Sequence, residues 1–271
     1  MIKIEARQIV KIFGSDEQKA LTQLRNGKTK TEILQQNNCN VGLDHVSLQI
    51  AAGQIFVIMG LSGSGKSTLV RHFNRLIDPT AGEILIDGQN ILTLDAAGLR
   101  HLRRRRISMV FQSFGLLPHQ TVLENTAYGL LVRGDNRTAS LVIARDWIDR
   151  VGLAGYENNY PDELSGGMRQ RVGLARALAL DTDIVLMDEA FSALDPLIRS
   201  EMQEQLLALQ ATLQKTIVFI THDLDEALRI GNRIAILRDG KLVQEGTPTD
   251  ILKNPADDYV RRFVEKRETV N

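Results

Sequence analysis

The segment GLSGSGKST at residues 60–68 has the residue types that hold a polyphosphate. It lies between the apolar run IFVIM at 55–59 and a helix-like stretch, which is the strand, loop and helix order that a phosphate-binding loop requires. Glycines let the backbone turn its N–H groups toward an anion at the helix start, and a lysine adds a cation for the outer phosphates. The predicted phosphate contacts come from Gly60, Leu61, Ser62, Gly63, Ser64, Gly65, Lys66, Ser67 and Thr68.

A pair of acidic residues closes another apolar run, IVLM at 184–187. Ligands of α/β sheets bind at the carboxyl ends of strands, where this pair is expected to lie. Asp188 is predicted to hold the shell of a Mg²⁺ ion together with the hydroxyl of Ser67. Glu189 is predicted to orient or deprotonate the water that attacks the nucleotide.

Polar residues follow two more candidate strands, Gln112 in MVFQS and His222 in FITHD. Gln112 is predicted to reach the metal or the water, and His222 the γ-phosphate. Each residue taken alone is more often a structural group. The phosphate loop and the acidic pair favour a shared catalytic role for Gln112, Glu189 and His222.

A second helix start suited to an anion occurs in ELSGGMRQR at residues 163–171. A serine and two glycines precede a stretch with apolar residues at helical spacing, so free N–H groups are expected to face outward. The alternative is a glycine turn that only caps a core helix. The residues in question are Ser165, Gly166 and Gly167.

Short apolar runs followed by helical patterns, such as DIVLMD at 183–188 and TIVFIT at 216–221, predict a parallel sheet covered by helices. Asp87-Gly88 and Asp239-Gly240 between β-rich arms predict hairpins. We therefore expect an α/β P-loop NTPase (RecA-like) fold, with a mixed-sheet core, an antiparallel β portion and an inserted α-helical subdomain. It would form one domain over residues 1–271, with the core at about 1–112 and 165–271 and the helical subdomain at about 113–164.

Composition sets limits on partners and compartment. The 271 residues include 33 Lys plus Arg and 33 Asp plus Glu, so no overall charge attracts nucleic acid, and none is expected as a partner. The cluster Arg103–Arg106 is either a nucleic-acid contact or, as favoured here, a solvated helix end. The single cysteine, Cys39, cannot form an internal disulfide. Signal-peptide features and long apolar runs are absent, which predicts a cytoplasmic protein that would act at a membrane only through another chain.

Taken together, these motifs resemble those of the ATP-binding subunit of an ABC transporter. They match the family's Walker A, Q-loop, signature, Walker B, D-loop and H-loop in order and spacing. The residue types at three positions within these motifs further resemble those of the glycine betaine/L-proline (quaternary amine, osmoprotectant) uptake family. The three residues are Leu61, Met168 and Ala190. Many members of that family continue into paired CBS domains. Because this sequence ends at Asn271, it resembles a short form of the family. Osmotic gating through CBS domains is therefore not expected here.

The resemblance implies ATP and Mg²⁺ as ligands and a homodimer in which the phosphate loop of one chain and Ser165–Gly167 of the other enclose each ATP. Phe13 in KIFG is expected to stack on adenine. Integral membrane permease subunits and, indirectly, an extracytoplasmic substrate-binding protein are the expected partners. The expected permease contact, for which packing within the helical subdomain is the alternative, comprises Phe114, Leu116, Leu117 and Pro118.

Other functions stay open at this point. The chain could energise uptake of another small solute, such as choline or histidine. An ABC ATPase that acts on nucleic acid or ribosomes would usually carry coiled-coil insertions or a second cassette, and neither occurs in this sequence. A small-molecule phosphotransferase would leave the second helix start without a use. The polar segment 15–43 has no assigned role.

Overall fold

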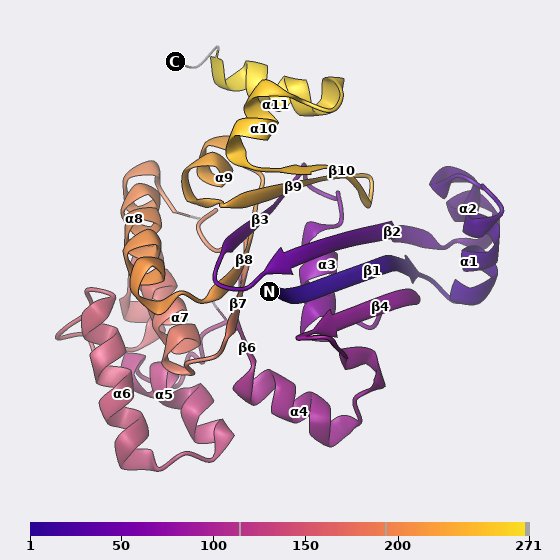
Figure 1. The fold of residues 1–271 in the computed structure, drawn as a ribbon. Helices are drawn as coiled ribbons and strands as arrows, with labels where there is room; N and C mark the ends of the chain where they lie inside the picture. Colours follow the sequence, from indigo (N-terminus) through magenta and orange to yellow (C-terminus); the bar gives the residue numbers. More distant parts are fainter. Residues whose placement is uncertain (114, 193, 269–271) are drawn as a thin grey trace. The chain divides into compact units, whose positions relative to one another are not determined.

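The computed structural model describes residues 1–113, 115–192 and 194–268 (Figure 1). The chain forms two compact units. The first contains Met1–Leu99 and His222–Asn271, and the second contains Arg100–Thr221. The predicted phosphate loop therefore belongs to the first unit, and the predicted acidic strand end belongs to the second.

An antiparallel sheet with the strand order β2-β1-β4-β5 lies in the first unit (Figure 1). Its central strand β1 pairs with β2 on one side and with β4 on the other. The strands are β1 (Ile2–Phe13), β2 (Asn40–Ala51), β4 (Ala81–Ile86) and β5 (Gln89–Asn90). This sheet is the antiparallel portion that the sequence predicts.

Two helices fill most of the unassigned segment between β1 and β2, namely α1 (Glu17–Arg25) and α2 (Lys30–Asn37). They lie at one end of β1 and β2 (Figure 1). Their apolar side chains share a small core with the ends of those strands, made of Val10, Ile12, Ala20, Leu21, Ile33, Cys39 and Val41. Burial of these side chains fixes the helices on the sheet.

A second group of strands in the first unit carries the phosphate loop. β3 (Ile55–Met59) is parallel to β9 (Arg233–Arg238), which is antiparallel to β10 (Lys241–Gly246). All of β3 is buried, as its continuous apolar run predicts. Further helices of this unit are α3 (Lys66–Phe73), the short 3₁₀ helix η1 (Ile91–Thr93), α9 (Leu224–Ile230), α10 (Pro248–Lys253) and α11 (Asp258–Glu268).

Both predicted hairpin turns are confirmed. Asp87 and Gly88 have φ of 48° and 78°, and Asp239 and Gly240 have φ of 50° and 72°. Positive φ at both central residues is the geometry of the type I′ turn, whose twist matches that of the strands it joins.

Three parallel strands, β6 (Ile107–Val110), β7 (Ile184–Asp188) and β8 (Thr216–Thr221), form the sheet of the second unit, with β7 in the middle. Every residue of β7 and β8 is buried. The chain enters this unit through α4 (Ala96–Arg105), whose last turn exposes three arginines to solvent. That position favours cations because the helix C-terminus carries partial negative charge, in agreement with the solvated helix end that we favoured.

Helices supply the rest of the second unit. They are α5 (Val122–Arg133), α6 (Arg137–Arg150), η2 (Pro161–Glu163), α7 (Gly166–Ala179) and α8 (Pro196–Leu213). Residues 115–164, as described, contain helices and turns but no strand. Among the helices of the described chain, none has the length and apolar character needed to cross a bilayer.

Candidate nucleotide-binding site

The phosphate loop connects β3 to α3 through glycines at positive φ. Gly60 has φ of 153°, and a Cβ at that position would lie 2.3 Å from the carbonyl oxygen of Leu237, so no larger residue fits. Gly65 is the N-cap of α3 and offers no side-chain acceptor to the first turn of the helix. A helix start of this kind receives an anion at its N–H groups.

Lys66 lies inside the loop, with 4% of its surface exposed. Its Nζ donates to the carbonyl oxygens of Gly60 at 2.8 Å and Leu61 at 3.0 Å. The cation thus holds the loop in a curved shape and adds positive charge to it. Of the other predicted contacts, Leu61, Ser62 and Gly63 are exposed, Ser64 is buried, and Ser67 and Thr68 are half-buried.

Tyr259 of α11 supports the loop, although no sequence signal identified it. The Leu61 N–H donates to its hydroxyl at 3.3 Å, and the hydroxyl donates to the Leu237 carbonyl at 3.3 Å. Burial raises the pKa of the Tyr259 phenol, so the group remains a neutral donor and acceptor. The hydroxyl therefore bridges the loop and β9.

Phe13 ends β1 and has 39% of its surface exposed. Its ring lies over Gly42, where an added Cβ would be 2.8 Å from Phe13 Cε2. The ammonium of Lys11 is 5.2 Å from the ring centroid and forms an ion pair with Glu17 of α1 at 3.1 Å. An aromatic face of this kind, open to solvent on one side, suits a stacked base.

The acidic pair lies at the carboxyl end of β7, as predicted. Asp188 is 1% exposed, and Glu189 is half-buried with φ of 47°. Glu189 Oε2 accepts a 3.1 Å hydrogen bond from Gln112 Nε2, and the Glu189 carbonyl accepts one from the Ser192 hydroxyl at 2.9 Å. A left-handed backbone at a non-glycine residue is uncommon and is held here by its neighbours.

His222 belongs to the first unit, whose second chain segment begins at this residue. Its side chain is exposed, just before α9.

Each unit, taken by itself, contains oxygen donors of the kind that Mg²⁺ binds. Ser67 offers a hydroxyl, Gln112 an amide oxygen and Asp188 a buried carboxylate, all of which are hard oxygen ligands. Among the described residues, no group of three or more His, Cys, Asp and Glu side chains is arranged to hold a metal ion. Mg²⁺ does not require such a group, because it takes most of its ligands from water and substrate phosphates.

The second helix start is the N-terminus of α7. Ser165 is its N-cap and accepts from the Met168 N–H at 3.3 Å. Ser165 is exposed, and nothing lies within 4 Å of a Cβ placed on Gly166, so this end of the helix is open. Gly167 faces Ile198, which an added Cβ would approach to 2.8 Å.

The predicted permease-contact segment is only partly described, because Phe114 lies outside the described residues. Leu116 and Leu117 are half-buried and Pro118 is exposed. The loop is held by the fully buried Asn125, whose Oδ1 accepts from the Leu117 N–H at 2.8 Å and whose Nδ2 donates to the Leu117 carbonyl at 3.0 Å. This residue was also missed by sequence reasoning, since a single helical asparagine carries no motif.

Arg176 of α7 fixes the beginning of the same loop. Its Nη1 donates to the Gly115 carbonyl at 2.7 Å, and burial lowers the pKa of its guanidinium. Arg176 at Gly115 and Asn125 at Leu117 thus hold the loop of residues 115–120 in position.

Comparison with known proteins identifies the family. Residues 43–192 match the ABC transporter family. The chain belongs to this family and has the fold of an ATP-binding cassette.

Its curated relatives include the glycine betaine/proline betaine transport system ATP-binding protein ProV of Escherichia coli (strain K12). This protein is 59% identical over 97% of the chain and 66% of its own length. The glycine betaine transport ATP-binding protein OpuAA of Bacillus subtilis (strain 168) is 58% identical over 97% of the chain and 63% of its own length. The chain thus spans somewhat less than two thirds of these relatives.

A solved structure gives the same fold. It is the dimeric, post-hydrolysis state of the ATP-binding cassette MJ0796 bound to ADP and Pi, with a TM-score of 0.76. The two sequences are 32% identical, and the match covers 90% of this chain and 98% of the other.

Proposed function

We propose that the chain is the ATP-hydrolysing subunit of an ABC importer that energises uptake of glycine betaine, proline betaine or a related quaternary amine. The observation that carries the catalytic part is the carboxylate of Glu189, held by Gln112 immediately after the buried Asp188. The substrate class is supported by the relatives, whose names state glycine betaine transport.

In the proposed reaction, the loop 60–68 binds the phosphates of ATP and Lys66 compensates their charge. A Mg²⁺ ion held by Ser67, Gln112 and Asp188 would neutralise charge on the outer phosphates. Glu189 orients a water and accepts its proton as the water oxygen attacks the γ-phosphorus and the bond to the β-phosphate oxygen breaks. His222 contacts the γ-phosphate, and Phe13 stacks on adenine.

The working form in this proposal is a homodimer. The open N-terminus of α7, with Ser165, Gly166 and Gly167, would complete the nucleotide site of the partner copy. A relative of the same fold is a dimer with ADP and Pi, which supports this arrangement. Attraction of the γ-phosphate to that helix start would favour closure, and its loss after hydrolysis would favour opening.

The proposed partners are two integral membrane permease subunits, contacted near Leu116, Leu117 and Pro118, and an extracytoplasmic binding protein that the chain meets only through them. The chain would therefore act at the cytoplasmic face of the membrane as a peripheral subunit. We also propose that residues about 113–164 move as the helical subdomain of a single cassette, with the core at about 1–112 and 165–271.

A direct test is to isolate the chain from membranes with its bound partners and to reconstitute the complex in liposomes with a candidate substrate-binding protein. We expect integral membrane chains to copurify, and glycine betaine or proline betaine uptake to require ATP. Choline and histidine serve as competing solutes. Recovery of ribosomes or DNA in place of membrane chains would refute the transport function, and ATP-driven uptake of histidine alone would refute the substrate class.

A further inference from the structure

The α1–α2 segment has no part in the proposed function so far, yet it is firmly built. Thr29 caps α2 with a reciprocal capping box to Glu32, and the apolar faces of both helices are buried on the ends of β1 and β2. At its other end, Glu17 of α1 bonds Lys11 and the Thr80 hydroxyl. Such a segment can hold other parts of the first unit in place.

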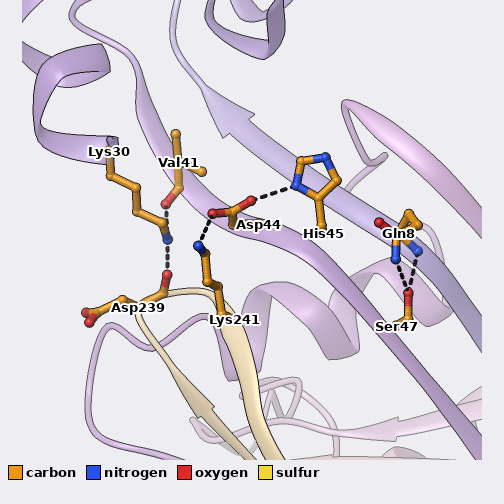
Figure 2. A network of polar contacts seen from close by, with 8 residues as sticks. All are labelled: Gln8, Lys30, Val41, Asp44, His45, Ser47, Asp239 and Lys241. Carbon is orange, nitrogen blue, oxygen red and sulfur yellow. Dashed lines mark hydrogen bonds and ion pairs between the residues drawn. The ribbon is translucent and has the colours of Figure 1, made fainter. Parts of the chain in front are cut away.

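Lys30, the first residue of α2, is the point at which this segment reaches another element. Its Nζ donates to the carbonyl oxygen of Val41 in β2 at 3.1 Å and to that of Asp239 in the β9–β10 turn. Figure 2 shows the ammonium between these two oxygens. The side chain is half-buried, and burial lowers its pKa. A cation here joins two backbone carbonyls from segments that are distant in sequence.

The β9–β10 turn continues the connection to the phosphate loop. The Gly240 N–H donates to the Ser64 carbonyl at 3.0 Å, and the Gly240 carbonyl accepts from the Asp44 N–H at 2.8 Å. A Cβ on Gly240 would lie 2.5 Å from the Gly42 carbonyl oxygen and 2.6 Å from Lys30 Nζ. The turn is therefore packed directly between β2, Lys30 and the loop.

Gly42 is where the two halves of the nucleotide site meet. A Cβ on Gly42 would lie 2.8 Å from Phe13 Cε2, and the Gly42 carbonyl oxygen is 2.8 Å from the position of a Cβ on Gly65 of the phosphate loop. A shift of β2 relative to the turn would thus displace the phosphate loop and the aromatic ring together, because close-packed backbone has little room to adjust.

We propose that Lys30 is a positioning residue for the nucleotide site: by joining β2 to the β9–β10 turn, it fixes the phosphate loop relative to Phe13. The inference rests on the proposed ATP-dependent function and assigns the α1–α2 segment a role in ATP affinity. An ion pair also joins the turn to β2, between Lys241 and Asp44 at 3.2 Å (Figure 2). The Lys241 side chain is 65% exposed, although Asp44 is buried, so water screens the ammonium and weakens this pair. The half-buried Lys30 is therefore the stronger connection.

The experiment compares Lys30→Gln and Lys30→Arg with Lys28→Gln, in the full chain. Lys28 lies in the same segment, and its ammonium donates to the Gln36 side chain of α2. Because no bond from this ammonium to β2 or to the β9–β10 turn is seen among the described residues, Lys28 is a matched control. Binding of a fluorescent ATP analogue gives Kd, and phosphate release gives kcat and KM. For Lys30→Gln we expect Kd and KM to rise about fivefold or more, the usual scale of coupling between linked sites. The kcat should stay within about twofold, since no transition-state contact is lost.

Lys30→Arg should retain most of the affinity, because a guanidinium can also donate to two carbonyls. Hydrogen exchange gives an independent readout: the amides of Asp44 and Gly240 should exchange faster in Lys30→Gln and not in Lys28→Gln. An unchanged KM and Kd in Lys30→Gln, or equal losses in the Gln and Arg variants, would overturn the inference. Absence of ATP turnover in the wild-type chain would instead count against the proposed function.

Discussion

Gln112 Nε2 donates a 3.1 Å hydrogen bond to Glu189 Oε2, although the two residues are 77 positions apart in the chain. The hydrogen bond fixes one carboxylate oxygen of Glu189 and leaves the other to contact a water, as a general base requires. The backbone of Glu189 is left-handed, with φ of 47°, a conformation that is uncommon for a non-glycine residue and that often occurs at functional sites. The relationship makes Glu189 the best supported candidate for a catalytic base in the second unit.

Glu189→Gln should therefore abolish most ATP turnover while ATP binding is retained. A general base contributes about 10²- to 10⁴-fold to a rate, and an amide cannot accept the proton. Phosphate release should fall by at least the lower figure, and gel filtration with ATP should show an accumulated dimer. Asp149→Asn, at an exposed position of α6, is the control and should hydrolyse ATP normally. Wild-type turnover in Glu189→Gln would remove Glu189 from the proposed role.

The shared nucleotide site predicts complementation between two inactive variants. Lys66→Ala damages the phosphate loop and Ser165→Arg blocks the open end of α7, so each variant alone should be inactive. A mixed dimer concentrates both defects in one site and leaves the other intact. Random mixing should therefore restore about a quarter of wild-type activity, because half of the dimers are mixed and each has one good site of two.

Phosphate release measured across mixing ratios tests this expectation. Activity should peak at the equimolar ratio and vanish toward either pure variant. If Ser165→Arg alone turned over ATP at the wild-type rate, α7 would have no part in the site.

Phe13 should contribute to nucleotide affinity through its half-exposed ring. Stacking of a base on an aromatic side chain is worth about 1–3 kcal/mol, so Phe13→Ala should weaken ATP binding by about 5- to 150-fold. Phe13→Tyr, which keeps the ring, should bind like wild type. Gly42→Ala should produce a similar loss while the ring is still present, since its Cβ would lie 2.8 Å from Phe13 Cε2 and displace the ring. Equal ATP affinity of all three variants, measured by titration calorimetry, would contradict the adenine assignment.

His72 of α3 should make the stability of the chain fall at mildly acidic pH. Burial lowers its pKa, the Thr68 carbonyl partly opposes this, and Lys11 adds to the lowering. Above the unfolded pKa of about 6.5 the imidazole is neutral in both states and has no effect. As pH falls through that value, the unfolded chain binds a proton that the folded chain excludes, so the free energy of unfolding decreases until the lower folded pKa is reached.

Urea unfolding at pH 8 and pH 5.5 checks this effect. Each pKa unit of lowering corresponds to about 1.4 kcal/mol of lost stability at the acidic end. His72→Met should lose less stability between the two pH values than wild type does. His119→Gln, at an exposed site, should behave like wild type. An identical pH dependence in His72→Met and wild type would show that other groups cause the decrease.

Features that depend on neighbours in the chain follow from the amino-acid sequence alone. The apolar run at 55–59 forms β3, TIVFIT forms β8, and both Asp-Gly pairs form turns, since period, burial and turn chemistry act within a few residues. The strand, loop and helix context of residues 55–73 is likewise evident from residue types and their order. The helices of segment 15–43 carry only short local signals, the N-cap Asp16 of α1 and the capping-box pair Thr29 and Glu32 of α2, which are too short to predict both helices.

Which distant groups meet depends instead on tertiary packing. Leu61 and Tyr259 are 198 residues apart, and Lys30 and Asp239 are 209 apart, yet each pair shares a hydrogen bond. Neither Tyr259 nor Lys30 belongs to a motif. Their positions follow from how helices and strands pack around a common core, and a backbone carbonyl accepts a bond from whatever side chain that packing brings to it.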